Sequence, residues 1–229
     1  MEAQVAEIAP VGREPEIIPP AEAKTYLASM GIPLEAVYHA LKTGEIEASN
    51  SSKYAPLTAA GTKRWIAVVE VARRMLDEKE NWVRSDAQNR PIAVSSSKEY
   101  TLAFVGGNAE TGDPRPEANP KAARRKGPAT ERAHKIEQLS IVLPESITGE
   151  IERAENVEHE RPRIGNWVLL YYRDKEEIRC EISFPSGVED GQFTGWFVRV
   201  LLESLPYKDA SLENTPEDIG GEDIDFYIA

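Results

Sequence analysis

Hydrophobic residues recur at helical spacing along the first third of the chain. They predict three helices, at about 21–30, 33–44 and 59–79, and Gly44 is expected to end the second. The apolar positions of that second helix are Leu34, Val37, Tyr38 and Leu41. The apolar stripe of the third helix comprises Trp65, Val68, Val69, Ala72, Met75 and Leu76. Arg64 and most other charged residues of this helix fall outside the stripe.

Strand-like patterns replace the helical spacing after residue 90. The intervals 91–95 and 100–105 predict a hairpin. Residues 167–172 (WVLLYY) are apolar on both faces, which predicts a central strand. Residues 177–184 alternate, so one face is expected to be buried and the other solvated. The interval 196–202 is interpreted as a third strand, although a helix also fits its pattern.

These elements predict an α+β protein in which a helical N-terminal part is followed by an antiparallel β-sheet part. An acidic N-terminal arm is expected over 1–19, and the isoleucines at its end could dock onto a partner or onto the body. The remaining divisions are a helical region ending in a hairpin (20–105), a basic loop with a short helix (106–135) and an acidic antiparallel region (136–229). Alternation at 224–228 predicts a tail strand.

Composition narrows the class of protein. The 229 residues include 27 basic and 39 acidic side chains, for a net charge of -12, which argues against a protein that coats nucleic acid or membrane with its whole surface. No apolar run approaches the length of a membrane helix, and the N-terminus lacks the apolar core of a signal peptide. The single cysteine, Cys180, excludes an internal disulfide, so a cytoplasmic location is expected.

Positive charge is concentrated in one short stretch. Residues 111–135 carry 7 basic and 3 acidic side chains, whereas 136–229 carry 8 and 21. The basic residues from 115 to 135, here called the basic segment, are Arg115, Lys121, Arg124, Arg125, Lys126, Arg132 and Lys135. Such a cluster on a Gly- and Pro-rich loop suits phosphate binding. The alternative, left open here, is that it pairs with the protein's own acidic half.

Signatures of common catalytic sites are missing. Gly107 and Gly112 have the spacing of a phosphate-binding loop, but Asp113 and Pro114 follow where Lys and Ser or Thr are needed, so an NTPase is excluded. The three histidines lie in different segments without metal-ligand spacing. Cys180 lies on the apolar side of its strand and is interpreted as a buried, inert thiol. No cofactor is implied.

Asp174, Glu177 and Glu181 form a weak alternative site, because carboxylates at a strand edge can hold Mg²⁺ for phosphodiester cleavage. The favoured interpretation is a solvated strand face, on which Arg179 pairs the two glutamates. The first two helices also have the helix-turn-helix spacing of a small winged-helix DNA-binding domain. The second of these helices has only His39 and Lys42 to contact a DNA groove. A helical hairpin packed for its own core is therefore favoured.

Several separated patches resemble a group of uncharacterised bacterial proteins that is common in actinobacteria and on mobile elements. The patches are Trp65, Asn81-Trp82, Gly106-Gly107-Asn108, Thr111-Gly112, Lys126-Gly127, Trp167-Val168-Leu169-Leu170 and Glu181-Ile182-Ser183-Phe184-Pro185. The resemblance implies a bacterial accessory protein, from a phage or defence locus, and transfers no site residue.

The first hypothesis is therefore a non-enzymatic interaction or accessory subunit of a bacterial or phage multi-protein system. Its acidic arms would contact protein partners, and the basic segment would hold a polyanion or an acidic partner face. The alternative is a nucleic-acid-binding protein, or a metal-dependent nucleic-acid-processing protein that uses Asp174, Glu177 and Glu181.

Overall fold

The computed structural model of the protein describes residues 14–80, 82–134 and 162–206. The labelled helices are α1 (Pro20–Ala28), α2 (Leu34–Ser49), α3 (Ala59–Glu80) and the short 3-10 helix η1 (Ala87–Asn89). The strands are β1 (Glu16–Ile18), β2 (Trp82–Ser85), β3 (Ile92–Ser95), β4 (Tyr100–Gly106), β5 (Gly165–Arg173), β6 (Glu177–Glu189), β7 (Gln192–Leu201) and β8 (Leu205–Pro206). A further helix begins at residue 128 and is described as far as residue 134. The expected α+β class is thereby confirmed.

The strands form one mixed, eight-stranded sheet in the order β1-β7-β6-β5-β4-β3-β2, with β8 paired to β6. Most neighbours run antiparallel, but β1 lies parallel to β7 and β4 lies parallel to β5. The β4–β5 pair connects the hairpin of β3 and β4 to the C-terminal strands, so both parts of the chain share one sheet. β5 occupies the middle of the order, and Leu169 and Leu170 are both fully buried, as predicted for a central strand.

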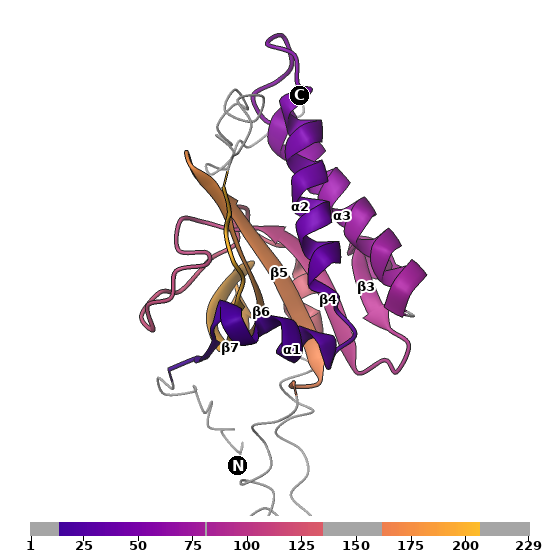
Figure 1. Cartoon of the computed structure of the whole chain (residues 1–229), viewed down its shortest axis with the longest axis vertical. Helices are drawn as coiled ribbons and strands as arrows, with labels where there is room; N and C mark the ends of the chain where they lie inside the picture. The colour runs from indigo at the N-terminus through magenta and orange to yellow at the C-terminus, as the bar shows by residue number, and fades with distance from the viewer. Residues whose placement is uncertain (1–13, 81, 135–161, 207–229) are drawn as a thin grey trace, which may run out of the picture.

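One face of the sheet carries the three α-helices (Figure 1). α2 and α3 lie side by side, α3 contacts β2, β3 and β4, and α1 contacts β7. Leu41 and Val68 from the helices join Leu102, Trp167 and Ile182 from the strands in one core. Full burial of an aliphatic side chain contributes roughly 1.5–3 kcal/mol, so this interface is a main source of stability.

The opposite face of the sheet is covered by residues 107–134. The apolar cluster on this face comprises Val105, Ala122, Val168, Leu170, Val188, Phe193 and Trp196. The Trp196 indole N–H donates to the Pro120 carbonyl oxygen at 3.2 Å. His134 packs edge-on against Phe193, with ring centroids 6.2 Å apart. The long connection expected from residue 106 is therefore a second covering layer of the sheet.

Helix α2 does not end at Gly44, so that prediction is wrong; the helix continues to Ser49. A Cβ atom at position 44 would lie 2.7 Å from Val68 Cγ2 and 3.1 Å from the Arg64 carbonyl oxygen. The glycine permits close approach of α2 and α3. The inward residues of α2 are buried, as expected for a helix packed into the protein's own core, but its main partner is α3 rather than α1, which contacts β7.

The end of the expected arm docks onto the body. Residues 16–18 pair with β7, and Ile18 is buried in the helical-side core. The arm before residue 14, the interval 135–161 and the expected tail strand at 224–228 lie outside the described residues.

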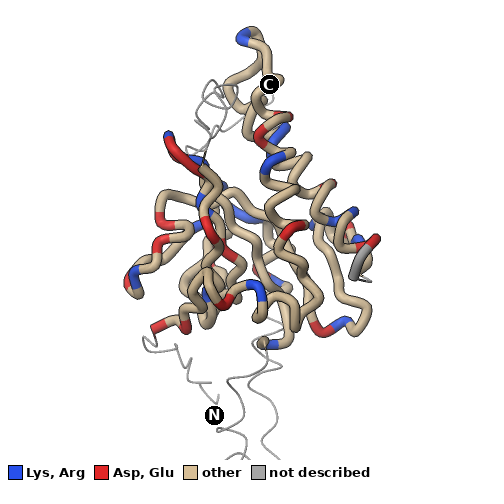
Figure 2. The backbone as a smooth tube through the Cα atoms, viewed as in Figure 1, with Lys and Arg blue, Asp and Glu red and all other residues tan. Residues whose placement is uncertain are grey.

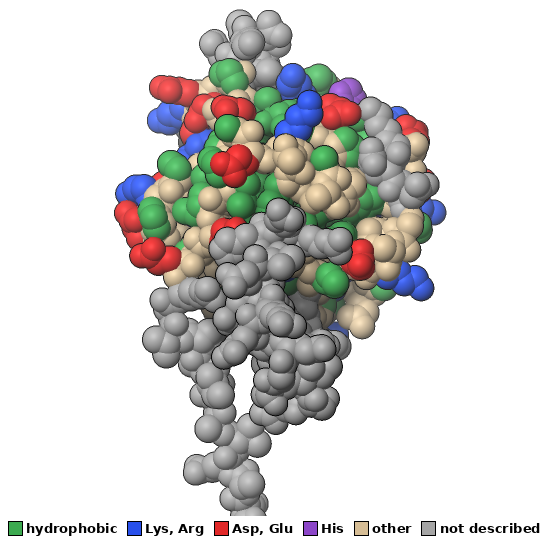
Figure 3. Space-filling view, turned by 60° about the horizontal axis from the view of Figure 1, so that its bottom comes forward, with side chains coloured by type: hydrophobic (Ala, Val, Ile, Leu, Met, Phe, Trp, Pro, Cys, Tyr) green, Lys and Arg blue, Asp and Glu red, His purple; other side chains and the backbone are tan. Residues whose placement is uncertain are grey.

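Charges of both signs occur along the helices and strands (Figure 2). Seen from the end where α1 lies, hydrophobic side chains are spread among polar ones (Figure 3).

Candidate functional site: a basic cleft

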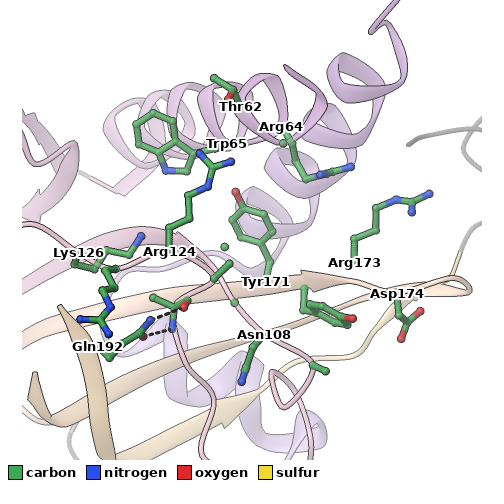
Figure 4. A pocket seen from close by; sticks show the side chains of 18 of the residues that line it. Thr62, Arg64, Trp65, Asn108, Arg124, Lys126, Tyr171, Arg173, Asp174 and Gln192 are labelled. Carbon is green, nitrogen blue, oxygen red and sulfur yellow. Dashed lines mark hydrogen bonds between the residues drawn. The ribbon is translucent and has the colours of Figure 1, made fainter. Parts of the chain in front are cut away.

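An open cleft of about 1220 Å³ lies between helix α3, the ends of β4 and β5, and residues 122–126. β4 ends at Gly106 and β5 at Arg173, and because these strands run parallel their carboxyl ends open at the same edge of the sheet. Figure 4 shows Arg124, Tyr171 and Arg173 extending from this side toward α3. Crevices at the carboxyl ends of parallel strands are frequent ligand sites in α/β sheets.

Basic side chains outnumber acidic ones in the lining of this cleft. The basic residues are Arg64, Arg124, Arg125, Lys126, Arg173 and Lys175, and the acidic residues are Asp174 and Glu176. The whole chain, by contrast, has a net charge of -12. A recess lined mainly by one sign of charge focuses the electrostatic field, so this recess attracts anions.

A buried carboxylate holds two of these cations. Glu45 of α2 is 1% exposed and forms ion pairs with the Nε atoms of Arg64 and Arg173, the latter at 3.1 Å. Arg64 is 3% exposed, so its expected position away from the buried side of α3 is wrong. Because one carboxylate faces two guanidinium groups, the trio itself keeps a net positive charge.

Three members of the basic segment line the cleft. Arg124 and Arg125 are exposed, and Lys126 is partly buried. Within the described residues, the side chains of Arg125 and Lys126 form no ion pair. Burial, and then the charge of Arg124, lower the pKa of Lys126 to about 8. Internal pairing with the acidic half therefore does not neutralise these two residues in that part of the chain.

The wall that carries these cations is fixed to the turn between β6 and β7. The Lys126 amide donates to the Gly191 carbonyl oxygen at 2.7 Å. Gly191 has a φ of 72°, and a Cβ there would lie 2.5 Å from the Lys126 carbonyl oxygen, so a side chain is excluded. Gln192 accepts from the Ala122 amide at 3.2 Å and donates to its carbonyl oxygen at 3.1 Å (Figure 4). The sheet therefore sets the position of residues 122–126.

The other members of the basic segment lie apart from this wall. Arg115 is bound to Asp113, and that contact lowers the pKa of Asp113 to about 2. The Lys121 ammonium donates to the Phe193 carbonyl oxygen. Arg132 is exposed on the helix that begins at residue 128, and Lys135 lies outside the described residues.

Glu181 belongs to a buried network on the sheet face that residues 107–134 cover, opposite the three α-helices. The expectation of a solvated strand face is therefore wrong at Glu181. Glu181, Ser183 and Arg199 are all fully buried. Arg199 donates to the two Glu181 carboxylate oxygens from Nε at 3.1 Å and from Nη2 at 2.6 Å, and the Ser183 hydroxyl donates to the same carboxylate at 2.7 Å. The layer of residues 107–134 covers these side chains, so their polar atoms depend on protein partners rather than on bulk water.

Backbone groups of that layer complete the network. The Gly112 amide donates to Glu181 at 2.9 Å. Arg199 also donates to the carbonyl oxygens of Ala118 at 3.1 Å and Asp113 at 3.0 Å. The ion pair thus fastens residues 112–118 to the sheet.

The acidic residues of the alternative metal site are not brought together. Asp174 accepts from the backbone amides of Glu176 and Glu177, and Glu177 accepts from the Ser204 hydroxyl. Arg179 pairs with Asp174 at 3.3 Å rather than joining the two glutamates. Among the described residues, no group of three His, Cys, Asp or Glu side chains could hold a metal ion.

Trp65 is a cleft residue that the helical pattern assigned to the apolar stripe. It is 38% exposed, and its indole N–H donates to the Phe104 carbonyl oxygen at 3.1 Å. Trp65 is the first residue of the apolar stripe, near the start of α3. This position is the one signal in the sequence that could have placed Trp65 at an edge of the core.

The remaining nucleophilic and titratable candidates lie elsewhere. His39 is exposed on α2, His134 is buried against Phe193, and His159 lies outside the described residues. Burial raises the pKa of the Cys180 thiol far above its usual range, which makes this thiol unreactive.

No protein-family model, curated protein or solved structure matches this chain. Among the described residues, no helix combines the length and apolar character needed to cross a membrane.

Proposed function

We propose that this protein is a non-enzymatic accessory protein that binds a polyanion in the basic cleft. The observation that carries the proposal is the charge of the cleft lining, six basic side chains against two acidic ones, in a chain of net charge -12. Arg125 and Lys126 lie on a wall whose backbone is held by the Gly191 carbonyl oxygen and the Gln192 side chain, so this backbone is in place before any ligand arrives. Preorganised cations of this kind favour anion binding, because less side-chain and loop entropy is lost.

The inferred role is binding rather than catalysis. The candidate carboxylates are engaged in separate structural contacts, and the Cys180 thiol is buried. The proposed setting is the cytoplasm of a bacterium, within a phage or defence system. Contacts of the acidic arms with protein partners are part of the same hypothesis.

The test is a fluorescence-anisotropy competition assay with long-chain inorganic polyphosphate. The cleft variant Arg124→Ala/Arg125→Ala/Lys126→Ala is compared with Lys24→Ala/Lys42→Ala/Arg84→Ala, which removes the same charge from exposed positions outside the cleft. The cleft variant is expected to bind about 10- to 100-fold more weakly than the wild type, and the control to stay within about threefold. Equal weakening of both variants, or no binding by the wild type, contradicts the proposal.

A further inference from the structure

The cleft contains an aromatic ring that is accessible from solvent. Trp65 is 38% exposed, whereas Trp82, Trp167 and Trp196 are 1%, 0% and 4% exposed. The hydrogen bond from its indole nitrogen to the Phe104 carbonyl oxygen limits rotation of the ring. A large apolar surface is thus held rigidly at the cleft instead of completing the core.

Cations line the same cleft as this ring. Arg124 to Lys126 form the wall across from α3, and Figure 4 shows the Arg124 side chain extending toward the helix that carries Trp65. A rigid aromatic face next to a row of cations matches a ligand in which flat rings alternate with anionic groups. Nucleotide strands have this alternation, because each phosphate is joined to a base with a π-face.

The size and concave shape of the cleft suit a single nucleic-acid strand better than a duplex. Its volume of about 1220 Å³ exceeds the roughly 300–1,000 Å³ typical of pockets for small ligands, so it accommodates several linked units. Much of the lining is small, with Gly61, Gly106, Gly107, Ala109, Ala122 and Ala123. Reading a duplex requires an element that protrudes into a groove, whereas this basic surface is concave.

We propose that the polyanion is single-stranded nucleic acid, with a base stacked on Trp65 and the neighbouring phosphates against Arg124, Arg125 and Lys126. This inference rests on the proposed function, and it adds the class of ligand and the residue that recognises the bases. Trp65 contributes stacking without sequence preference, since every base presents a flat face.

The test compares four probes of matched length and charge where chemistry allows: oligo(dT), an abasic deoxyribose-phosphate strand, inorganic polyphosphate and poly-glutamate. Affinity is measured for the wild type, Trp65→Leu, Trp65→Phe and a control, Tyr54→Leu, which removes an aromatic side chain that is 86% exposed and outside the cleft. Intrinsic fluorescence gives a second readout, because Trp65 is the exposed member of the four tryptophans.

The wild type is expected to bind oligo(dT) more tightly than the abasic strand, with quenching of the Trp65 emission by oligo(dT) alone. Trp65→Leu is expected to weaken oligo(dT) binding by about 5- to 150-fold and to weaken polyphosphate binding far less, because polyphosphate has no ring to stack. Trp65→Phe retains most of the affinity, which separates stacking from a merely structural role, because Phe also lacks the indole N–H. Tyr54→Leu is expected to match the wild type.

Three results overturn the inference. If oligo(dT) and the abasic strand bind equally, bases are not recognised, while the polyanion function stands. If poly-glutamate binds as tightly as oligo(dT), the ligand is an acidic protein segment. If the wild type binds none of the probes, the proposed function fails as well.

Discussion

Replacement of Arg199 by methionine is predicted to destabilise the protein severely. Arg199 and Glu181 are both 0% exposed and share two hydrogen bonds, so Arg199→Met leaves a carboxylate buried without a counter-charge. Breaking one side of a buried ion pair costs about 3–5 kcal/mol, a large fraction of the roughly 5–15 kcal/mol by which a domain is stable.

The double variant Glu181→Met/Arg199→Met provides a sharper test of the same network. Replacing both members of a buried pair by apolar residues is often neutral in other proteins. Here the Gly112 amide and the carbonyl oxygens of Ala118 and Asp113 also lose their partners. Unsatisfied buried groups cost about 1–3 kcal/mol each, less where water reaches them, so the double variant is expected to remain destabilised by about 2–4 kcal/mol.

Urea denaturation followed by circular dichroism measures both effects as changes in the free energy of unfolding. The control is Glu189→Gln, which removes an exposed carboxylate from the same strand and is expected to change the stability by less than about 0.5 kcal/mol. The reasoning is refuted if Arg199→Met lies within about 1 kcal/mol of the wild type, or if the double variant is as stable as the wild type.

The remaining predictions concern packing, charge and loop position. Gly44→Ala is expected to lower the free energy of unfolding by about 1–3 kcal/mol, because its Cβ would press on Val68; Gly127→Ala, with no atom within 4 Å of the added Cβ, is expected to be neutral in the same urea titration. Since the pKa of Lys126 is about 8, the ammonium loses its charge as the pH rises through that value. Polyphosphate affinity should therefore fall between about pH 7 and pH 9, and an unchanged fall in Lys126→Arg would contradict this assignment. Gln192→Ala removes two hydrogen bonds to Ala122, so amide hydrogen exchange at 122–126 should accelerate while exchange in β5 stays unchanged.

Local periodicity is sufficient to predict three helices, the longer strands and the fold class, but not the short strands β1, β2 and β8. The apolar run at 167–172 indicated a central strand, and alternation at 177–184 identified Ile178 and Ile182 as core residues. Periodicity describes one element at a time, however, and does not specify which segment covers it. The second face of β6 was therefore misassigned, because residues 112–118, which cover Glu181, lie more than sixty positions earlier in the chain.

The prediction of the site was limited for the same reason, because the contacts between α2 and α3 cannot be derived from the pattern of either helix alone. Arg64 is buried because Glu45 on the preceding helix lies opposite, and Gly44 lets the two helices approach closely enough for that contact. Neither fact follows from the pattern of α3 alone. Clustering in the sequence did identify Arg124, Arg125 and Lys126, but the cleft also depends on the parallel pairing of β4 and β5. Parallel neighbours carry no signal at short range in the sequence.

The salt dependence of oligo(dT) binding tests the central claim that the cleft holds a polyanion. Affinity is measured across a series of salt concentrations for the wild type and for Arg124→Ala/Arg125→Ala/Lys126→Ala. Each phosphate neutralised on a single strand contributes about 0.7 to the slope of log affinity against log salt. The account predicts a slope shallower by about 2 in the triple variant. Identical slopes for the two proteins would contradict it.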